Sequence, residues 1–165
     1  MVSTSVGYTG GSLAEPTYKQ VCTDRTGHAE VVELSFDPSL TSYEALLRFF
    51  FSMHNPTTRY RSGPDIGTQY RSAIFFHTPE QQATAAAVMA ELNQTTFKGG
   101  IVTELNAATR FWPAEEYHQD YYKGTGIVLT RRGPKVQSNA YKFYREACGR
   151  DARVKAVWGD QAFSH

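Results

Sequence analysis

The stretch that decides the fold is HAEVVELSF, at residues 28–36. Val32, Leu34 and Phe36 stand at alternate positions, with polar residues at 33 and 35 between them. An alternation of period two predicts a half-buried β-strand. Glu30 falls on the apolar side of this strand and is therefore the most informative single residue of the chain.

A glutamate is rarely fully buried without a partner, so the position of Glu30 has two interpretations. If the carboxyl group is desolvated, its pKa rises and it acts as a proton donor near neutral pH. If Glu30 lies at the end of the strand and reaches solvent, it is an ordinary surface carboxylate. Periodicity alone leaves both open.

Outward from this strand, short helical and strand-like patterns alternate, which predicts an α+β fold with helices packed on a mixed sheet. Thr41-x-x-Glu44 is a capping box that predicts a helix start, and Pro56 ends that helix. The further expected elements are a loop at 55–68, a strand at 69–77, a helix from 78 to about 93, a strand at 101–105, a helix start at 113–116, an irregular segment at 124–135 and a helix at 137–148.

Length and composition narrow the class of protein. The 165 residues suffice for one globular domain, and the net charge of +1 argues against nucleic acid or a membrane as partner. No apolar run is long enough to cross a bilayer, and no signal peptide precedes the first strand. Two cysteines give neither a disulfide scaffold nor a zinc site, so we expect a reducing, cytoplasmic setting without metal.

The charge is unevenly distributed. Residues 1–122 carry 8 Lys and Arg against 13 Asp and Glu, whereas residues 123–165 carry 9 against 3. We expect one domain over residues 1–122 and a basic extension, 123–165, that packs on or trails from it. A solvated tail is the simpler interpretation of this extension, and contact with RNA or an acidic protein is the alternative.

Five segments resemble the peptide-methionine sulfoxide reductase A family, in the order in which that family has them. They are VGYTGG at 6–11, PTYKQVC at 16–22, TGHAEVVELSFDP at 26–38, GPDIGTQYRSAIFF at 63–76 and FWPAEEYHQDYY at 111–122. The resemblance implies a two-layer sandwich with a sheet related to the ferredoxin-like pattern. It also implies a monomeric protein-repair oxidoreductase of oxidative stress, which reduces methionine-S-sulfoxide in proteins, and free methionine sulfoxide, to methionine.

The same resemblance implies roles for individual residues. Glu30 looks like the acid that protonates the sulfoxide oxygen, and Tyr18 and Tyr70 look like the hydroxyls that hydrogen-bond it. Asp65 and His118 look like residues that shape the pocket. No bound cofactor is implied, only thioredoxin as external reductant, and Cys148 would be the resolving cysteine by its late position.

One motif of the family is not in this sequence. The family's nucleophile lies in a Gly-Cys-Phe-Trp segment upstream of the position of Val6, so we expect the first strand and helix of the fold to be missing and turnover to be negligible. An internal start, a fragment completed in trans and a member that has lost catalysis are the three explanations. A non-catalytic module that binds oxidised methionine is the alternative function.

Overall fold

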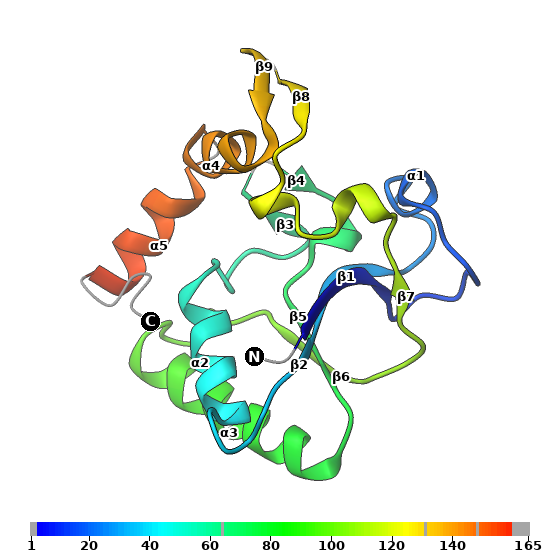
Figure 1. Ribbon diagram of the computed structural model, residues 1–165. Helices are drawn as coiled ribbons and strands as arrows, with labels where there is room; N and C mark the ends of the chain where they lie inside the picture. Colours follow the sequence, from blue (N-terminus) through cyan, green and yellow to red (C-terminus); the bar gives the residue numbers. More distant parts are fainter. Residues whose placement is uncertain (1–2, 64, 131, 148, 160–165) are drawn as a thin grey trace.

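The computed structural model describes residues 3–63, 65–130, 132–147 and 149–159, and Figure 1 shows its path. Helices and strands are mixed along the chain, as the α+β prediction requires. The first half comprises β1 (Ser3–Thr9), α1 (Tyr18–Val21), β2 (Ala29–Ser35), α2 (Tyr43–Ser52), β3 (Arg61–Ser62), β4 (Asp65–Ile66), the 3₁₀ turn η1 (Thr68–Tyr70) and β5 (Ala73–Phe76). The second half comprises α3 (Pro79–Thr95), β6 (Glu104–Ala107), β7 (Trp112–Pro113), η2 (Glu116–His118), η3 (Tyr121–Lys123), β8 (Ile127–Thr130), β9 (Gly133–Val136), α4 (Gln137–Ala147) and α5 (Arg150–Trp158).

Strand β1 forms the middle of a three-stranded antiparallel sheet, in the order β2-β1-β7. The register places Tyr8 opposite both Glu30 and Trp112. Gly7 lets β7 approach, because a Cβ there would lie 2.4 Å from the Trp112 carbonyl oxygen. The sheet thus brings residues near 8, 30 and 112 side by side.

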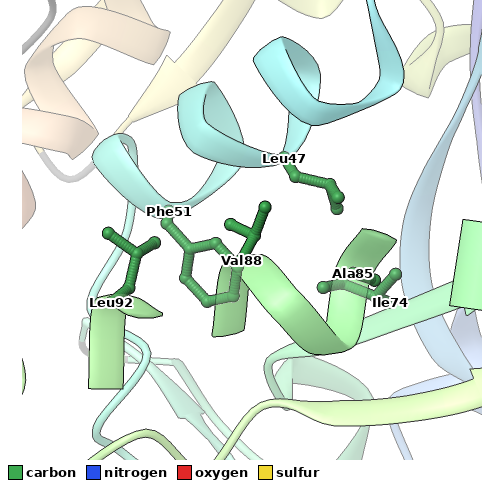
Figure 2. Packing of buried hydrophobic residues seen from close by; sticks show 6 residues of the cluster. All are labelled: Leu47, Phe51, Ile74, Ala85, Val88 and Leu92. Carbon is green, nitrogen blue, oxygen red and sulfur yellow. The ribbon is translucent and has the colours of Figure 1, made fainter. Parts of the chain in front are cut away.

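A second, parallel pair joins β5 to β6, with α3 as the crossover helix. Helix α2 packs against α3 over this pair, and Leu47, Phe51 and Val88 form the centre of the apolar cluster between them (Figure 2). Phe51 is completely buried. This cluster is the main hydrophobic core of the described residues and lies away from β1 and β2.

Several sequence-based boundaries are confirmed and others are wrong. The strand expected at 28–36, the helix from 78 and the helix at 137–148 correspond to β2, α3 and α4. The helix α2 is capped by Ser42 rather than Thr41, because the Ser42 hydroxyl accepts the hydrogen bond from the Ala45 N–H at 3.1 Å. The predicted helix start at 113–116 becomes the single 3₁₀ turn η2, and only the second half of the strand expected at 69–77 forms, as β5.

The apolar face of β2 is more open than its alternation predicts. Val32 is 56% exposed and Leu34 is 41% exposed, and both line a large cavity beside the sheet. Among the described residues no helix covers this face. The alternation is therefore real, but it borders an open space and not a packed layer.

The segment after residue 123 is more ordered than the irregular stretch expected at 124–135. It forms the β8–β9 hairpin, which protrudes in Figure 1, followed by α4 and α5. Trp158, at the end of α5, meets Phe97 edge to face with ring centroids 5.8 Å apart. No helix in the described ranges combines the length and apolar character needed to cross a membrane.

Candidate active site

The Glu30 side chain turns into the cavity from β2. Its Oε1 atom is buried and has no hydrogen-bond partner in the described part of the chain. Burial, together with the nearby Asp65 carboxylate, raises the pKa of Glu30 to about 7. Of the two interpretations that periodicity left open, the structure favours the desolvated one, and the carboxyl group gains and loses its proton near neutral pH.

Tyr18 is the first residue of α1, and local hydrogen bonds fix this short helix. Thr17 and Gln20 form a capping box, in which the Thr17 N–H donates to the Gln20 Oε1 at 2.9 Å. The Tyr18 N–H donates to the Glu115 Oε1 at 2.8 Å, so the helix start is tied to a segment 97 residues away. The phenol is thereby presented from a rigid turn.

Tyr70 ends the turn η1, which is bound to the loop that precedes β2. The Thr68 N–H donates to the Asp24 carboxylate at 2.7 Å. The Arg71 guanidinium donates to the Gly27 carbonyl at 3.1 Å and forms an ion pair with Glu104 at 3.1 Å. These bonds hold Tyr70 next to the strand that carries Glu30.

The two phenols form a connected pair close to the carboxyl group. The side chains of Tyr70 and Cys22 both act on the pKa of the Tyr18 hydroxyl and lie near it. Burial is the main cause that raises the pKa of Tyr18 and raises the pKa of Tyr70 to about 12, and the Glu30 carboxylate adds to both shifts. Both hydroxyls therefore remain protonated and can donate to an oxygen atom.

Asp65 and His118 line the same cavity as this group. Asp65 is exposed on β4, and its charge is the second cause of the raised pKa of Glu30. The His118 ring contacts Tyr18 in a tilted arrangement, with centroids 4.5 Å apart and an interplanar angle of 54°, and its buried Nε2 has no hydrogen-bond partner among the described residues. Burial lowers the pKa of His118 despite the opposing charge of Glu115.

One cavity of about 1450 Å³ brings the predicted residues together. Five of the six site residues expected from the sequence line it: Tyr18, Glu30, Asp65, Tyr70 and His118. The sixth, Cys148, lies outside the described residues. Cys22 follows directly after α1, is exposed and forms no disulfide bond. Its thiol lies near the hydroxyl of Tyr18, which lines the cavity.

Sequence reasoning missed Glu115, which anchors two parts of the site. Its Oε2 accepts a hydrogen bond from the buried Tyr8 hydroxyl at 2.9 Å, and its Oε1 accepts from the Tyr18 N–H. Burial alone would raise the pKa of Glu115, but these hydrogen bonds outweigh it and lower the pKa. The acidic pair at 115–116 suggested only a helix start.

Gln119 was also missed. Its side-chain amide brackets Val6, accepting from the Val6 N–H at 2.9 Å and donating to the Val6 carbonyl at 2.8 Å. The same Nε2 donates to the Ala114 carbonyl at 3.0 Å. The Gln119 amide makes with Val6 the pair of hydrogen bonds that a neighbouring strand would otherwise make. Such a contact leaves no periodic pattern in the sequence, so nothing except the family resemblance of this segment indicated that it belongs to the site region.

The buried His28 supports the loop before β2. The Gly11 N–H donates to its Nδ1 at 3.1 Å, and its Nε2 lies 2.8 Å from the Leu13 carbonyl oxygen, which fixes the tautomer with the proton on Nε2. A Cβ at Gly11 would lie 2.4 Å from the Thr26 carbonyl oxygen, so this close approach requires glycine. His28 is thus a structural residue beside Glu30.

The arrangement suits the protonation of an oxygen atom that gains negative charge. A neutral carboxyl group and two protonated phenols converge on one partly enclosed space, where hydrogen bonds to a developing charge are stronger than in water. Across the ranges that the structure describes, no group of three His, Cys, Asp or Glu side chains is placed to hold a metal ion.

Comparison with known proteins shows the family to which the chain belongs. A family model described as peptide methionine sulfoxide reductase matches residues 1–160. A relative named peptide methionine sulfoxide reductase MsrA, from Methanoculleus marisnigri, is 55% identical over 127 residues, which are 76% of this chain and 77% of that protein. The MsrA of Methanosarcina mazei is 50% identical, and the match covers 78% of this chain but 61% of that longer protein.

Solved structures agree with the sequence relatives. Reduced Mxr1 from Saccharomyces cerevisiae matches with a TM-score of 0.71 and 36% identity, over 74% of this chain and 70% of that one. Methionine sulfoxide reductase A of Corynebacterium diphtheriae matches with a TM-score of 0.69 and 38% identity, over 74% and 63%. These matches bear out the α+β fold, and the chain belongs to the peptide methionine sulfoxide reductase family of oxidoreductases.

Proposed function

We propose that the cavity binds the side chain of methionine-S-sulfoxide in peptides and proteins, and that of free methionine sulfoxide. Tyr18 and Tyr70 donate hydrogen bonds to the sulfoxide oxygen, and Glu30 supplies the proton that this oxygen takes up. The observation that carries the proposal is the buried, unpartnered Oε1 of Glu30 beside two phenols that stay protonated. Asp65 shapes the rim and His118 forms the wall behind Tyr18.

The reaction that this site serves is a thiol-dependent reduction. A thiolate attacks the electrophilic sulfur, the oxygen passes to the attacking thiol as sulfenic acid, and the thioether of methionine is released. A second thiol condenses with the sulfenic acid, giving a disulfide and water, and thioredoxin reduces that disulfide. In this scheme Cys148 is the second thiol and no cofactor is bound.

We further propose that the 165-residue polypeptide binds the sulfoxide but turns it over negligibly by itself. Its sequence contains no Gly-Cys-Phe-Trp segment, and Cys22 is exposed and is not among the residues that line the cavity. These 165 residues then recognise oxidised methionine as a binding module, and turnover requires a nucleophilic thiol that they do not themselves place beside Glu30.

Calorimetric titration with a short peptide that carries the S-epimer tests the binding proposal. We expect saturable binding, at least about tenfold tighter than for the same peptide with unoxidised methionine. Glu30→Gln removes the acid and weakens binding, whereas Glu15→Gln, an exposed glutamate outside the cavity, leaves it unchanged. Equal binding of oxidised and unoxidised peptide contradicts the proposal.

A thioredoxin-coupled assay tests the second part. We expect NADPH consumption at the background rate with the S-epimer as substrate. Turnover above the background rate would overturn the proposal, and its loss in Cys22→Ser or Cys148→Ser would show that the cysteine concerned takes part in the reaction.

A further inference from the structure

The cavity is larger than the sulfoxide side chain needs, and both acidic and basic side chains line it. Binding pockets for small ligands commonly measure about 300–1,000 Å³, whereas this cavity measures about 1450 Å³. Its acidic lining residues, Glu30, Glu33 and Asp65, come from β2 and β4. Another wall of the cavity comes from α4 and α5 and contributes Arg145 and Arg153.

This wall is held in place at both ends. Helix α4 lies against η3, and Tyr144 on α4 contributes to the raised pKa of Tyr121 on η3, next in effect to burial. At the other end, Trp158 on α5 packs on Phe97. Figure 1 shows α4 and α5 following one another along one side of the molecule. The basic segment is therefore a fixed wall of the cavity.

The cations of the wall differ in what they already bind. Arg145 donates to the Asp151 carboxylate at 2.8 Å and is neutralised by it. The exposed Arg153 guanidinium has no ion-pair or hydrogen-bond partner within the described ranges of the chain. On the β3 side, Arg61 donates to the Gly63 carbonyl at 2.6 Å but has no carboxylate partner there. Arg153 and Arg61 thus offer unmatched positive charge to whatever occupies the cavity.

Aromatic side chains and further cations surround these arginines. Phe143 and Tyr144 line the cavity with ring centroids 5.4 Å apart. The Arg132 guanidinium lies 5.6 Å from the centroid of the Phe143 ring, and the Lys135 ammonium lies 5.3 Å from it. Such a surface packs the apolar part of a peptide and attracts anionic side chains.

We infer that this site selects methionine sulfoxide in acidic segments of a polypeptide, with a carboxylate close in sequence to the oxidised residue bound by Arg153 and Arg61. The inference rests on the proposed function and deepens it. The carboxyl group of Glu30 and the two phenols take the sulfoxide oxygen, while the guanidinium groups of Arg153 on α5 and Arg61 on β3 pair with Glu or Asp of the same peptide.

Three peptides that differ only in charge test the inference. Each carries one S-epimer methionine sulfoxide in its centre and is flanked on both sides by two Glu, two Gln or two Lys residues. We expect the Glu peptide to bind roughly tenfold more tightly than the Gln peptide and the Lys peptide to bind most weakly, with the preference falling as salt is raised.

Variants locate the source of this preference. Arg153→Gln reduces the advantage of the Glu peptide and Arg153→Glu reverses the order of the Glu and Lys peptides. Lys155→Glu, on the same helix and outside the cavity lining, changes the net charge equally and leaves the order unchanged. Both positions are exposed, so each variant retains the fold, which circular dichroism verifies.

The possible failures are distinct. If the three peptides bind equally and each more tightly than its unoxidised form, the proposed function stands and the inference is wrong. If Lys155→Glu acts like Arg153→Glu, the preference comes from net charge and the assignment to Arg153 is wrong. If oxidation makes no difference to any peptide, the proposed function itself fails and this inference fails with it.

Discussion

Leu47, Phe51 and Val88 meet between α2 and α3 with side chains that carry no polar atoms, whereas the surroundings of Glu30 are held by hydrogen bonds from segments far apart in the chain. Burial of apolar area stabilises without fixing direction. Hydrogen bonds contribute less free energy each but demand one geometry. The first region therefore supplies stability, and the second supplies the orientation of the reactive groups.

The second region also holds two glutamates in opposite states. Glu30 has a buried oxygen without a partner, and its pKa is raised to about 7. Glu115 accepts hydrogen bonds from Tyr8 and Tyr18, and its pKa is lowered. One side chain is thus kept as an acid and the other as an anion that positions its neighbours, because their surroundings shift the two pKa values in opposite directions.

Removal of Phe51 from the apolar cluster has the largest expected effect. Phe51→Ala leaves a cavity in a fully buried region and lowers the free energy of unfolding by about 3–5 kcal/mol. Urea unfolding followed by circular dichroism measures the loss. Phe49→Ala, on the same helix but 43% exposed, is the control and costs less than about 1 kcal/mol. Equal losses would show that the cluster is not the main source of stability.

Replacement of Glu115 tests whether this residue orients the Tyr18 side chain in addition to stabilising the fold. Glu115→Ala leaves the buried Tyr8 hydroxyl and the Tyr18 N–H without their acceptor and costs about 2 kcal/mol of unfolding free energy. We expect affinity for a methionine sulfoxide peptide to fall about tenfold in calorimetry at a temperature where the variant is folded. Glu116→Ala, at the exposed neighbouring position, is the control and retains both the stability and the affinity of the parent. Unchanged affinity in folded Glu115→Ala would contradict the positioning role.

Glu30→Gln tests the charge state of the first glutamate. The raised pKa means that the folded protein loses stability as pH rises through about 7, because the buried group must then ionise, while below the ordinary value of 4.5 no such loss remains. Glutamine does not ionise, so the variant is more stable than the parent at pH 8, by about 1–2 kcal/mol after allowance for partial solvent access, and the gain shrinks towards pH 5. Thermal unfolding across this range measures it. A constant difference at all pH values would mean that Glu30 is an ordinary surface carboxylate.

The smallest effect is expected at the surface link between α2 and α3. Arg48 pairs with Glu91 at 2.7 Å and with Glu44 at 2.9 Å, all three being well exposed. Arg48→Ala costs less than about 1 kcal/mol, and the cost falls further in 1 M salt. Unfolding curves at low and high salt decide this, and a loss as large as that of Phe51→Ala would show that the ion pairs and not the apolar cluster join the helices.

Much of the fold could be predicted from local sequence patterns, and the elements that were not predicted were missed for physical reasons. Strand β2 was found because its apolar residues alternate. Strand β1 was not, since STSVGYT mixes serine, threonine and glycine and depends on β2 and β7 for its pairing. The β8–β9 hairpin was interpreted as irregular because Gly133 and Pro134 are turn residues by composition.

The site divides in the same way. Glu30 was identified because a charged residue interrupted an apolar pattern, and the family resemblance supplied Tyr18, Tyr70, Asp65 and His118. Their common cavity could not be read from one sequence, because it depends on contacts across about a hundred residues. The role of Glu115 depends on a partner 97 residues away and left no local pattern.

The bracket that Gln119 places around Val6 joins residues 113 positions apart. During synthesis β1 leaves the ribosome long before Gln119 does. The hydrogen bonds at this edge of β1 therefore form only after most of the polypeptide has been made. Contacts of such long range slow folding. A nascent chain therefore cannot complete this edge of the sheet until Gln119 has emerged from the exit tunnel.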